Sequence, residues 1–431
     1  MFLGEEILSM GLLKKGNKKL KMKILLVNKF YYIKGGCETY YFSLKKLLEE
    51  KNNKVIPFSM NHERNFYNEY KNYFIKNIDY NQSNLLEKIV GAFKIIYNLE
   101  AKRKIKKLIK DIRPDIAHLN NFNHQLSPSI LSPLKKMNIP IVYTAHDLKL
   151  ICPNYKMLNK NGLCEKCKGN RFYNCTVNKC VKESRLYSLI STFEAYIHYI
   201  FSSYQNIDII ITPSKFFKDK FVEFGYEEDK VRYLPNFINI EEYKPNYNFK
   251  NYYIYVGRLS EEKGVINLIK AAEKNKEYLL RVIGTGPTEG ELKKYIEERN
   301  IKNIVFDGFK TGDELKALIR NARFLVIPSI CYENNPMSVI ESMALGKVVL
   351  GSNIGGIPEL INNDKLLFKH NDIDSMANII REIFELTEEE IIKIGKKNRK
   401  LIEESYSKEV HYNKLMEIYE EVINKYEGVK K

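Results

Sequence analysis

The sequence predicts an α/β protein built from two doubly wound, Rossmann-like domains. The chain has 431 residues, of which 44% are hydrophobic, and this is enough material for two cores of ordinary size. Short apolar runs alternate with amphipathic helical stretches in each half of the chain. Such alternation indicates parallel sheets covered by helices. No run of about 18 apolar residues is present, so no membrane-spanning helix is expected.

The domain boundaries follow these two rounds of alternation. Met22 begins a run that resembles a natural start followed directly by a first strand, so the preceding stretch is a basic extension or a mis-assigned start. A polar, irregular stretch separates the two rounds of alternation and is predicted to be a linker. The predicted parts are an extension (1–21), a first domain (22–235), a linker (236–250), a second domain (251–407) and a last helix (408–431).

The elements of the first half are identified by their hydrophobic periodicity. Strands are predicted at 24–27, 55–58, 115–119, 140–145, 207–212 and 231–234, and helices at 37–50, 85–113, 183–205 and 215–224. The second half repeats the pattern, with strands at 252–256, 278–283, 304–306, 324–327 and 348–350. Its helices are predicted at 265–275, 291–300 and 314–322 and from residue 336, and the chain is mostly helical after residue 359.

The positive charge of the chain is concentrated in its first half. Residues 1–240 hold 40 Lys and Arg against 22 Asp and Glu, whereas the remainder holds 30 against 31. This asymmetry suggests an anionic partner, either a membrane surface or a nucleic acid. The helix at 85–113 carries a basic face that suits an anionic membrane, although a core helix with a solvated basic face explains it equally well. No nucleic-acid-binding motif accompanies the charge, so no nucleic acid partner is expected.

Five of the seven cysteines lie between Cys152 and Cys180. No secretory signal precedes the first strand, so these cysteines indicate a metal site or reduced thiols rather than a disulfide framework. A C-x-x-C pair with further cysteines nearby suits tetrahedral zinc, and four thiolates would leave no open position for catalysis. The predicted ligands of a structural zinc are Cys152, Cys164, Cys167 and Cys180, with Cys175 as a substitute; the alternative is free thiols in a loop.

The stretch 331–347 combines two acids with the start of a helix. Pro336 favours an extended Asn335 and is itself suited to a first helical position, so a helix is predicted to begin there. Glu333 then lies in the loop before the helix and Glu341 on its second turn. The free N–H groups of a helix start attract anions, so the stretch suits a ligand with a phosphate and several hydroxyls. The alternative is a surface helix with solvated acids.

Glycines and charged side chains also follow several other predicted strands. Ligands of open α/β sheets bind at the carboxyl ends of the strands, and glycine lets a backbone approach a phosphate closely. Arg258 and Lys263 together form a diphosphate clamp on physical grounds, with a bidentate fork and a point charge. His146 could exchange a proton near neutral pH. The residues at these strand ends are Gly35, Gly36, His146, Asp147, Gly257, Arg258, Lys263, Gly264, Gly284, Thr285, Gly286 and Pro287.

The order of these motifs resembles glycosyltransferase family 4 over nearly the whole chain from Met22. The resemblance implies the GT-B fold, in which two Rossmann-like domains face each other across a cleft, and sugar transfer with retention of configuration. The first domain would be the acceptor side and the second the nucleotide-sugar donor domain, with the last helix (408–431) packing back on the first. The cysteine-rich insertion resembles that of a subset of the family.

The resemblance also implies roles for individual residues. Arg258 and Lys263 would hold the donor diphosphate, Glu341 the ribose and Glu333 the donor sugar, while His146 would lie near the transferred sugar. The chain departs from many relatives in having Asn334 and Asn335 after Glu333, where Gly or Asn and then an apolar residue are common. Further donor contacts would come from Gly35, Gly36, Gly257, Gly284, Asn334, Asn335, Pro336, Met337 and Ser338.

The implied reaction is transfer of a sugar from a UDP- or GDP-sugar to a glycan or lipid-linked acceptor, as in bacterial surface polysaccharide synthesis. No cofactor is expected for catalysis, because Arg258 and Lys263 can neutralise the leaving diphosphate. The expected location is the cytoplasm, at the inner face of the membrane in the case of a lipid-linked acceptor. The alternatives are a nucleotide-sugar epimerase of the same fold and a non-catalytic nucleotide-sugar-binding protein.

Overall fold

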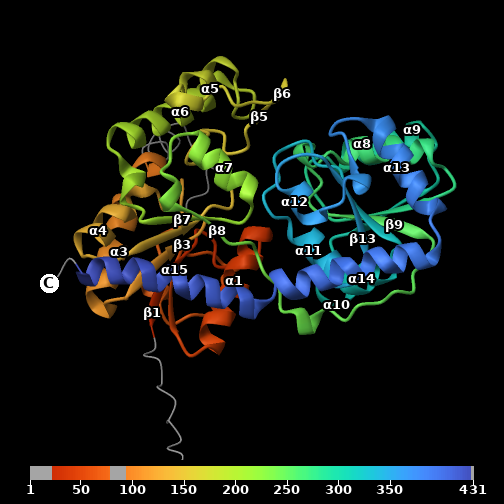
Figure 1. The fold of residues 1–431 in the computed structure, drawn as a ribbon. Helices are drawn as coiled ribbons and strands as arrows, with labels where there is room; N and C mark the ends of the chain where they lie inside the picture. The colour runs from red at the N-terminus through yellow and green to blue at the C-terminus, as the bar shows by residue number, and fades with distance from the viewer. Residues whose placement is uncertain (1–21, 78–93, 429–431) are drawn as a thin grey trace, which may run out of the picture.

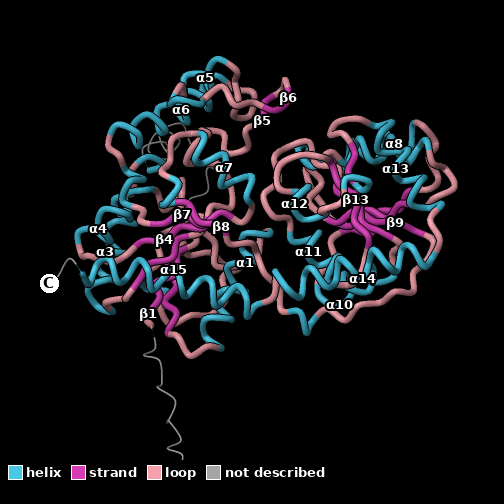
Figure 2. Tube along the Cα trace, viewed as in Figure 1, coloured by secondary structure: helices cyan, strands magenta, loops and turns pink. Residues whose placement is uncertain are grey.

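The computed structural model describes residues 22–77 and 94–428. Two α/β domains lie next to each other, the first on the left and the second on the right of Figure 1. Figure 2 shows the strands of each domain gathered at its centre, with helices around them. None of the described helices combines the length and the apolar character needed to cross a membrane.

The first domain contains a six-stranded sheet in the order β2-β1-β3-β4-β7-β8. Every neighbouring pair is parallel, as the alternation of strands and helices predicts. Apart from the edge strand β8, the strands are largely buried on both faces and rich in Ile, Leu and Val. Their bounds are β1 (Lys23–Val27), β2 (Lys54–Phe58), β3 (Ile116–Leu119), β4 (Ile141–Thr144), β7 (Ile209–Thr212) and β8 (Val231–Tyr233).

Helices from both ends of the chain cover one face of this sheet. Helix α1 (Gly36–Glu50) and the C-terminal helix α15 (Lys408–Gly428) share one buried cluster with the strands. In Figure 1, α15 crosses the first domain from the side of the second domain to the C-terminus at the far left. The Tyr419 hydroxyl on α15 lies 2.5 Å from Nδ1 of His118, a buried β3 residue. Helices α3 (Leu99–Ile112), α4 (Leu131–Lys136) and α7 (Lys215–Glu223) contribute to the cluster on the other face.

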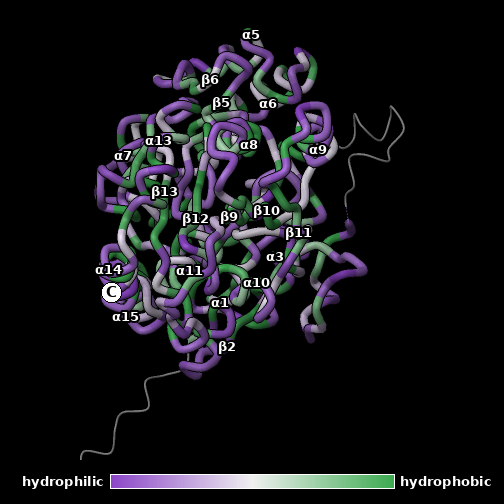
Figure 3. Tube along the Cα trace, turned by 90° about the vertical axis from the view of Figure 1, so that its right-hand side faces the viewer, coloured by the Kyte–Doolittle hydropathy of each residue, from purple (hydrophilic) through white to green (hydrophobic). Residues whose placement is uncertain are grey.

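The second domain contains a parallel sheet in the order β11-β10-β9-β12-β13-β14. Figure 3 shows β11, β10, β9, β12 and β13 next to one another in this order. The strands are β9 (Tyr252–Val256), β10 (Leu279–Ile283), β11 (Ile304–Gly308), β12 (Phe324–Ile327), β13 (Val348–Ser352) and β14 (Leu367–Phe368). The helices are α8 (Val265–Lys274), α9 (Glu289–Glu298), α10 (Gly312–Asn321), α11 (Met337–Ala344), α12 (Ile357–Ile361), α13 (Ile373–Glu385) and α14 (Glu388–Ser405).

The single helix predicted over 85–113 is wrong in its extent. Helix α3 begins at Leu99, where the side chain of Asn98 caps it by accepting a hydrogen bond from the Ala101 N–H. The part of the prediction at 85–93 lies outside the described residues. The apolar side of α3 is buried in the core of the first domain, so its basic residues form the outer side of a core helix.

The cysteine-rich stretch is an insertion between β4 and β7. It contains a small hairpin, β5 (Leu158–Asn159) and β6 (Gly162–Leu163), followed by α5 (Tyr173–Val177) and α6 (Arg185–Ile200). Burial raises the pKa of the Cys152 thiol to about 11, and the thiols of Cys152, Cys164 and Cys180 lie close enough to Cys167 to raise its pKa further. All of these cysteines are free thiols. Within residues 22–77 and 94–428, no three His, Cys, Asp or Glu side chains are arranged to hold a metal ion, so zinc binding stays a prediction.

Zinc binding is tested by metal analysis of the purified protein. If the four thiols are ligands, protein from metal-replete cells holds about one zinc per chain, and Cys167→Ser loses it together with part of its thermal stability. Cys37→Ser is the matched control, because Cys37 lies on α1, outside the insertion. Metal-free protein that unfolds at the same temperature with and without added zinc contradicts the prediction.

Candidate functional site

The topology of the second sheet brings two loops together. The chain builds this sheet outward from β9 in both directions, so the order reverses between β9 and β12. Crevices at such reversals, outside the carboxyl ends of the strands, are where open α/β sheets bind ligands. The loop 257–264 follows β9, and the loop 328–336 follows β12. Two of the predicted site segments therefore meet at one point.

An ion pair joins these two loops. Lys263 Nζ lies 2.6 Å from Glu333 Oε1, and the Ser329 hydroxyl donates to the same oxygen. Burial lowers the pKa of Lys263, but the neighbouring Glu333, Cys331 and Tyr255 together raise it by more, so the pKa ends above its ordinary value. Glu333 is 8% exposed, which leaves its carboxylate largely shielded from water. Sequence reasoning had assigned these residues to separate parts of a ligand, whereas the structure pairs them directly.

Two glycines permit the close approach of the loops. Gly264 has a φ of 65°, and a Cβ there would lie 2.1 Å from the carbonyl oxygen of Pro328. Gly284, at the end of β10, has a φ of 135°, and its Cβ would lie 1.9 Å from the carbonyl oxygen of Gly257. Larger residues would push apart the loops after β9, β10 and β12, so these glycines are required by the backbone itself.

Arg258 differs from Lys263 in that its side chain has no partner among the residues that the structure describes. It is exposed, and its backbone carbonyl accepts from the Tyr255 hydroxyl at 2.8 Å and from the Ser260 N–H at 3.1 Å. No residue within the described part of the chain forms a hydrogen bond or ion pair with its guanidinium. The site therefore offers one paired cation and one available cation on the same loop.

Helix α11 begins close to the predicted position. Pro336 is its N-cap, and Met337 and Ser338 form its first turn, whose N–H groups have no partner within the helix. Burial raises the pKa of Glu341 to about 7, and this rise is opposed by a hydrogen bond that Tyr243 donates over 3.1 Å to Glu341 Oε1. This carboxyl therefore titrates near neutral pH, far above an exposed glutamate.

The two asparagines after Glu333 contact the other domain and the linker. Asn334 Nδ2 donates to the carbonyl oxygen of Ala145 over 2.9 Å, and Asn334 Oδ1 accepts from the Ser214 hydroxyl. Asn335 accepts two hydrogen bonds from Asn236, one on its side chain and one on its backbone carbonyl. The side chains that depart from the common family pattern are thus occupied in holding the loop against the first domain and the linker.

His146 follows β4, and its side chain hydrogen-bonds within the first domain. Its Nε2 lies 3.0 Å from Asn120 Oδ1, and Asn120 Nδ2 points to the carbonyl oxygen of Val27. This orientation of the amide assigns the proton of His146 to Nε2. Burial lowers the pKa of His146 to about 4, so the ring is neutral at pH 7 and does not exchange a proton there.

Gly35 and Gly36 lie at the start of α1, and Gly36 is not required by packing. A Cβ on Gly36 would meet no atom within 4 Å, and one on Gly35 would only touch Glu38 at 3.9 Å. Both residues are exposed. The backbone here is open to an approaching ligand, in contrast to Gly264 and Gly284.

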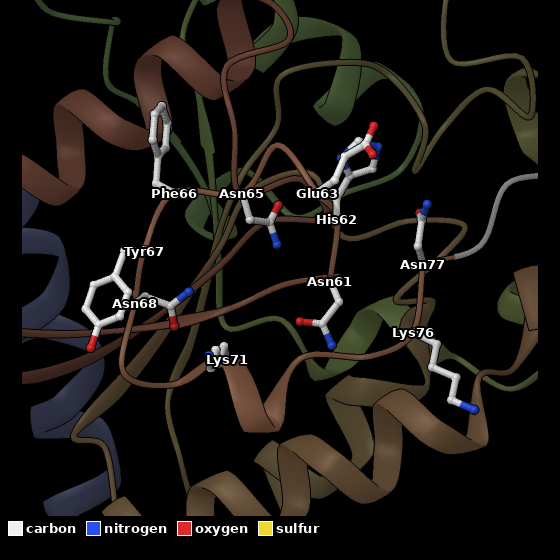
Figure 4. A pocket seen from close by; sticks show the side chains of 10 residues that line it. All are labelled: Asn61, His62, Glu63, Asn65, Phe66, Tyr67, Asn68, Lys71, Lys76 and Asn77. Carbon is white, nitrogen blue, oxygen red and sulfur yellow. The ribbon is translucent and has the colours of Figure 1, made fainter.

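A polar hollow lies near this glycine loop in the first domain. It encloses about 930 Å³ and is formed by the segment after β2, as Figure 4 shows. The ring of His62, on its wall, lies 4.7 Å from the ring of Tyr32, and Tyr32 precedes the glycine loop. The lining residues are Asn61, His62, Glu63, Asn65, Phe66, Tyr67, Asn68, Lys71, Lys76 and Asn77.

Sequence reasoning missed four residues that position the predicted ones. Ser329 and Tyr243 hydrogen-bond to the two acids, and Asn120 orients His146. Glu359, on α12, accepts from the backbone N–H groups of Lys215 and Phe216 at the start of α7 and so ties the two domains together. Ser329 lies only four residues before Glu333, but the other contacts join segments far apart in sequence, and no local pattern signals those.

Comparisons with known proteins agree with this architecture. Residues 34–242 match the model described as Glycosyltransferase Family 4, and residues 239–408 match the model described as Glycosyl transferases group 1. An uncharacterized 42.6 kDa protein in the cps region of Klebsiella pneumoniae is 28% identical over 375 residues, which cover 82% of this chain and 92% of that protein. The amylovoran biosynthesis glycosyltransferase AmsK of Erwinia amylovora is 26% identical over 231 residues, which cover 49% of this chain and 56% of that protein.

A solved structure shares the fold across both domains. The HepE protein of Anabaena in complex with UDP-glucose aligns with a TM-score of 0.64 and 16% identity, over 93% of this chain and 100% of that one. The two family models together extend from residue 34 to residue 408 and meet at the linker. The chain is therefore a glycosyltransferase of the family 4 type with the GT-B fold.

Proposed function

We propose that this enzyme transfers a sugar, with retention of configuration, from a UDP- or GDP-sugar to a glycan or lipid-linked acceptor in surface polysaccharide synthesis. The observation that carries the proposal is the group of Lys263, Glu333 and Arg258 at the strand reversal between β9 and β12. The name of the Erwinia relative and the UDP-glucose in the Anabaena structure support this substrate class.

The donor would occupy the crevice with its diphosphate against Arg258 and Lys263. The Arg258 guanidinium, unpaired within the described residues, can bind a phosphate oxygen. The ion pair with Glu333 keeps Lys263 charged, so the Lys263 ammonium can bind a phosphate oxygen in place of the Glu333 carboxylate. The first-turn N–H groups of Met337 and Ser338 would add to the anion site. Glu341 would accept hydrogen bonds from the ribose hydroxyls, and Gly36 leaves room for the diphosphate on the opposite side.

Glu333 suits a hydrogen-bonding role better than a nucleophilic one. Its Oε1 already accepts from Lys263 and Ser329, so Oε2 is the oxygen that could take a sugar hydroxyl. A retaining hydrolase needs a carboxylate free to attack the anomeric carbon. We therefore infer attack by the acceptor hydroxyl on the face that the diphosphate leaves, with the hydroxyl proton passing to the leaving phosphate oxygen.

Charge development explains what the cations contribute. As the bond to phosphate breaks, the sugar gains positive charge and the diphosphate gains negative charge. Arg258 and Lys263 would stabilise that leaving group most strongly in the transition state, and this differential stabilisation is what accelerates the reaction. Neutral His146 would contribute an acceptor at Nδ1 for a sugar hydroxyl rather than a proton.

The acceptor would enter from the first domain. The polar hollow beside the glycine loop offers asparagine amides and lysines, which suit the hydroxyls of a glycan or the phosphates of a lipid-linked one. The excess positive charge of the first half favours an acceptor at an anionic membrane surface. The enzyme would then act in the cytoplasm, at the inner face of the membrane.

The donor is tested by thermal unfolding with a panel of UDP- and GDP-sugars. One nucleotide class is expected to raise the unfolding temperature, because ligands stabilise the state that they bind. Arg258→Ala should lower the affinity for that donor about 10- to 100-fold, since the substitution removes a charged hydrogen bond. Its unliganded unfolding temperature should stay unchanged, because the side chain is exposed and has no partner within the described residues. Stabilisation that is equal in wild type and Arg258→Ala contradicts the assignment.

Replacing Lys263 tests the leaving-group role. Lys263→Ala should lower kcat by about 10²–10³, the usual loss for one contact to a developing anion. The change also leaves the buried Glu333 without its cation, so Lys263→Ala/Glu333→Gln should recover stability without recovering turnover. Lys302→Ala, on an exposed lysine of the same domain, is the matched control. Turnover near that of wild type in Lys263→Ala would exclude this role.

The pH dependence of donor binding tests Glu341. A carboxylate accepts two ribose hydroxyls, whereas the acid form must donate one hydrogen, so binding is expected to select the ionised form. Because the pKa of Glu341 is raised to about 7, donor affinity should be constant above pH 7 and fall about tenfold per pH unit below it. The nucleotide sugar has no group that titrates in this range, so it is a better probe than the free diphosphate. Glu341→Gln should bind the donor weakly at all pH values. A wild-type donor affinity that stays constant from pH 8 to pH 6 refutes the role of Glu341 in binding the ribose.

A further inference from the structure

Helix α6 has its polar side inward and its apolar side outward. Each side chain that α6 buries is polar: Ser188, Thr192, Glu194 and His198. Glu194 is 1% exposed and forms an ion pair with the buried Lys149 at 2.8 Å. The Thr192 hydroxyl bonds to Thr176 and to the carbonyl oxygen of Phe172. These contacts fix the helix in its inverted orientation.

The outer side of α6 is a continuous apolar stripe. Leu186, Leu189, Phe193 and Ile200 are spaced by three, four and seven residues, which puts them on one side of a helix. Their exposed fractions are 65%, 54%, 56% and 70%, and that of the following residue, Phe201, is 76%. At 1.5 Å per residue the stripe is about 22 Å long. Tyr187 and Tyr199, together with Tyr173 and Val177 of α5, widen it.

Exposure of this apolar stripe to water is energetically unfavourable. Single exposed apolar residues are ordinary, but an apolar patch of this length marks an interaction site. The apolar spacing of α6 is that of a helix that packs against an apolar surface. The apolar side of α6 does not face the core of the first domain, so the surface that it packs against lies outside this domain. Figure 1 shows α5 and α6 at the outer end of the first domain, away from α15 and the linker.

Basic residues border the stripe. Lys179, Lys182 and Arg185 are exposed next to the start of α6, and Lys182 Nζ lies 5.1 Å from the Tyr187 ring. Lys166 and Arg171 are exposed in the preceding part of the insertion. Between residues 160 and 201, Glu183 is the exposed acid. Apolar side chains, interfacial tyrosines and a basic border together match the boundary of an anionic bilayer.

We propose that the stripe on α5 and α6 (Tyr173, Val177, Leu186, Leu189, Phe193, Ile200 and Phe201) docks the enzyme on an anionic membrane surface, with α6 lying in the plane of the headgroups. A second copy of the chain fits less well, because pairing two such surfaces would bring their lysines and arginines together. Helix α3 is not the docking element, since its apolar side is already buried in the core. The inference deepens the proposed lipid-linked acceptor, but its test measures binding alone and so fails independently of the transfer reaction.

The chain contains no tryptophan, so one introduced residue reports the local environment without background. Phe193→Trp is expected to shift its fluorescence to the blue when vesicles of phosphatidylcholine and phosphatidylglycerol are added. The matched control is Phe309→Trp, on an exposed residue of the second domain, which should not shift. Added salt should reduce the binding, because headgroup attraction is screened. The absence of a shift at Phe193, or an equal shift at Phe309, would overturn the proposal.

A second pair of variants separates docking from folding. Leu189→Gln/Phe193→Gln changes exposed side chains, so the unfolding temperature should not fall, whereas co-sedimentation with anionic vesicles should weaken about tenfold or more. Val305→Gln/Phe309→Gln, which changes two exposed apolar residues of the second domain, should sediment like the wild type. Unchanged sedimentation of the Leu189→Gln/Phe193→Gln variant refutes the surface. A wild-type dimer that this variant converts to a monomer, without vesicle binding by either, would identify a second copy as the occupant instead.

Discussion

The ion pair between Lys263 and Glu333 is the contact on which the candidate site depends. It joins the loop after β9 to the loop after β12, the two strands between which the sheet reverses its order. Without Glu333, the partly buried Lys263 would lose the main interaction that raises its pKa. Without Lys263, a carboxylate that is 8% exposed would be left with the Ser329 hydroxyl. The pair thus holds both charges in place, ready for the anion and hydroxyls of the proposed donor.

The loop after β12 also contacts the first domain. Asn334 bonds to the Ala145 carbonyl, one residue before His146, and Tyr332 donates over 2.6 Å to Glu165 in the insertion. Glu359 caps α7 of the first domain from the second. Rotation of the domains would break these contacts together, so the relative position of Glu333 and His146 is coupled to the observed arrangement of the two halves.

Much of the fold follows from local periodicity. Strand β9 was predicted with its observed bounds, and helix α11 begins one residue after the predicted Pro336. The helix over 85–113 was wrong in extent, because the capping side chain of Asn98 interrupts a pattern that is apolar on both sides of it. Periodicity also identified α6 but not its orientation, since a stripe facing a bilayer and one facing a core have the same spacing.

The candidate site was predictable in its residues and not in its connections. Glycines, an arginine, a lysine and acids at strand ends signal a phosphate site because each has a characteristic chemistry. The pairing of Lys263 with Glu333 spans 70 residues, and that of Tyr243 with Glu341 spans 98, so only the folded topology brings them together. The lowered pKa of His146 is likewise a consequence of burial, which sequence position at a strand end does not specify.

The insertion contains the proposed membrane-docking stripe and also contacts the candidate site. Its outer helices carry the apolar stripe, while Glu165, between Cys164 and Cys167, accepts from Tyr332 and pairs with Lys220 at 2.8 Å. Lys156, in the same insertion, lies 3.4 Å from Glu262, the residue before Lys263. A force on α5 and α6 from a bilayer would therefore act on a unit that already contacts both loops of the candidate site. If α5 and α6 dock on a membrane as proposed, that docking would be physically connected to the ordering of the loops after β9 and β12, and a surface bearing the acceptor would also favour the arrangement proposed to bind the donor.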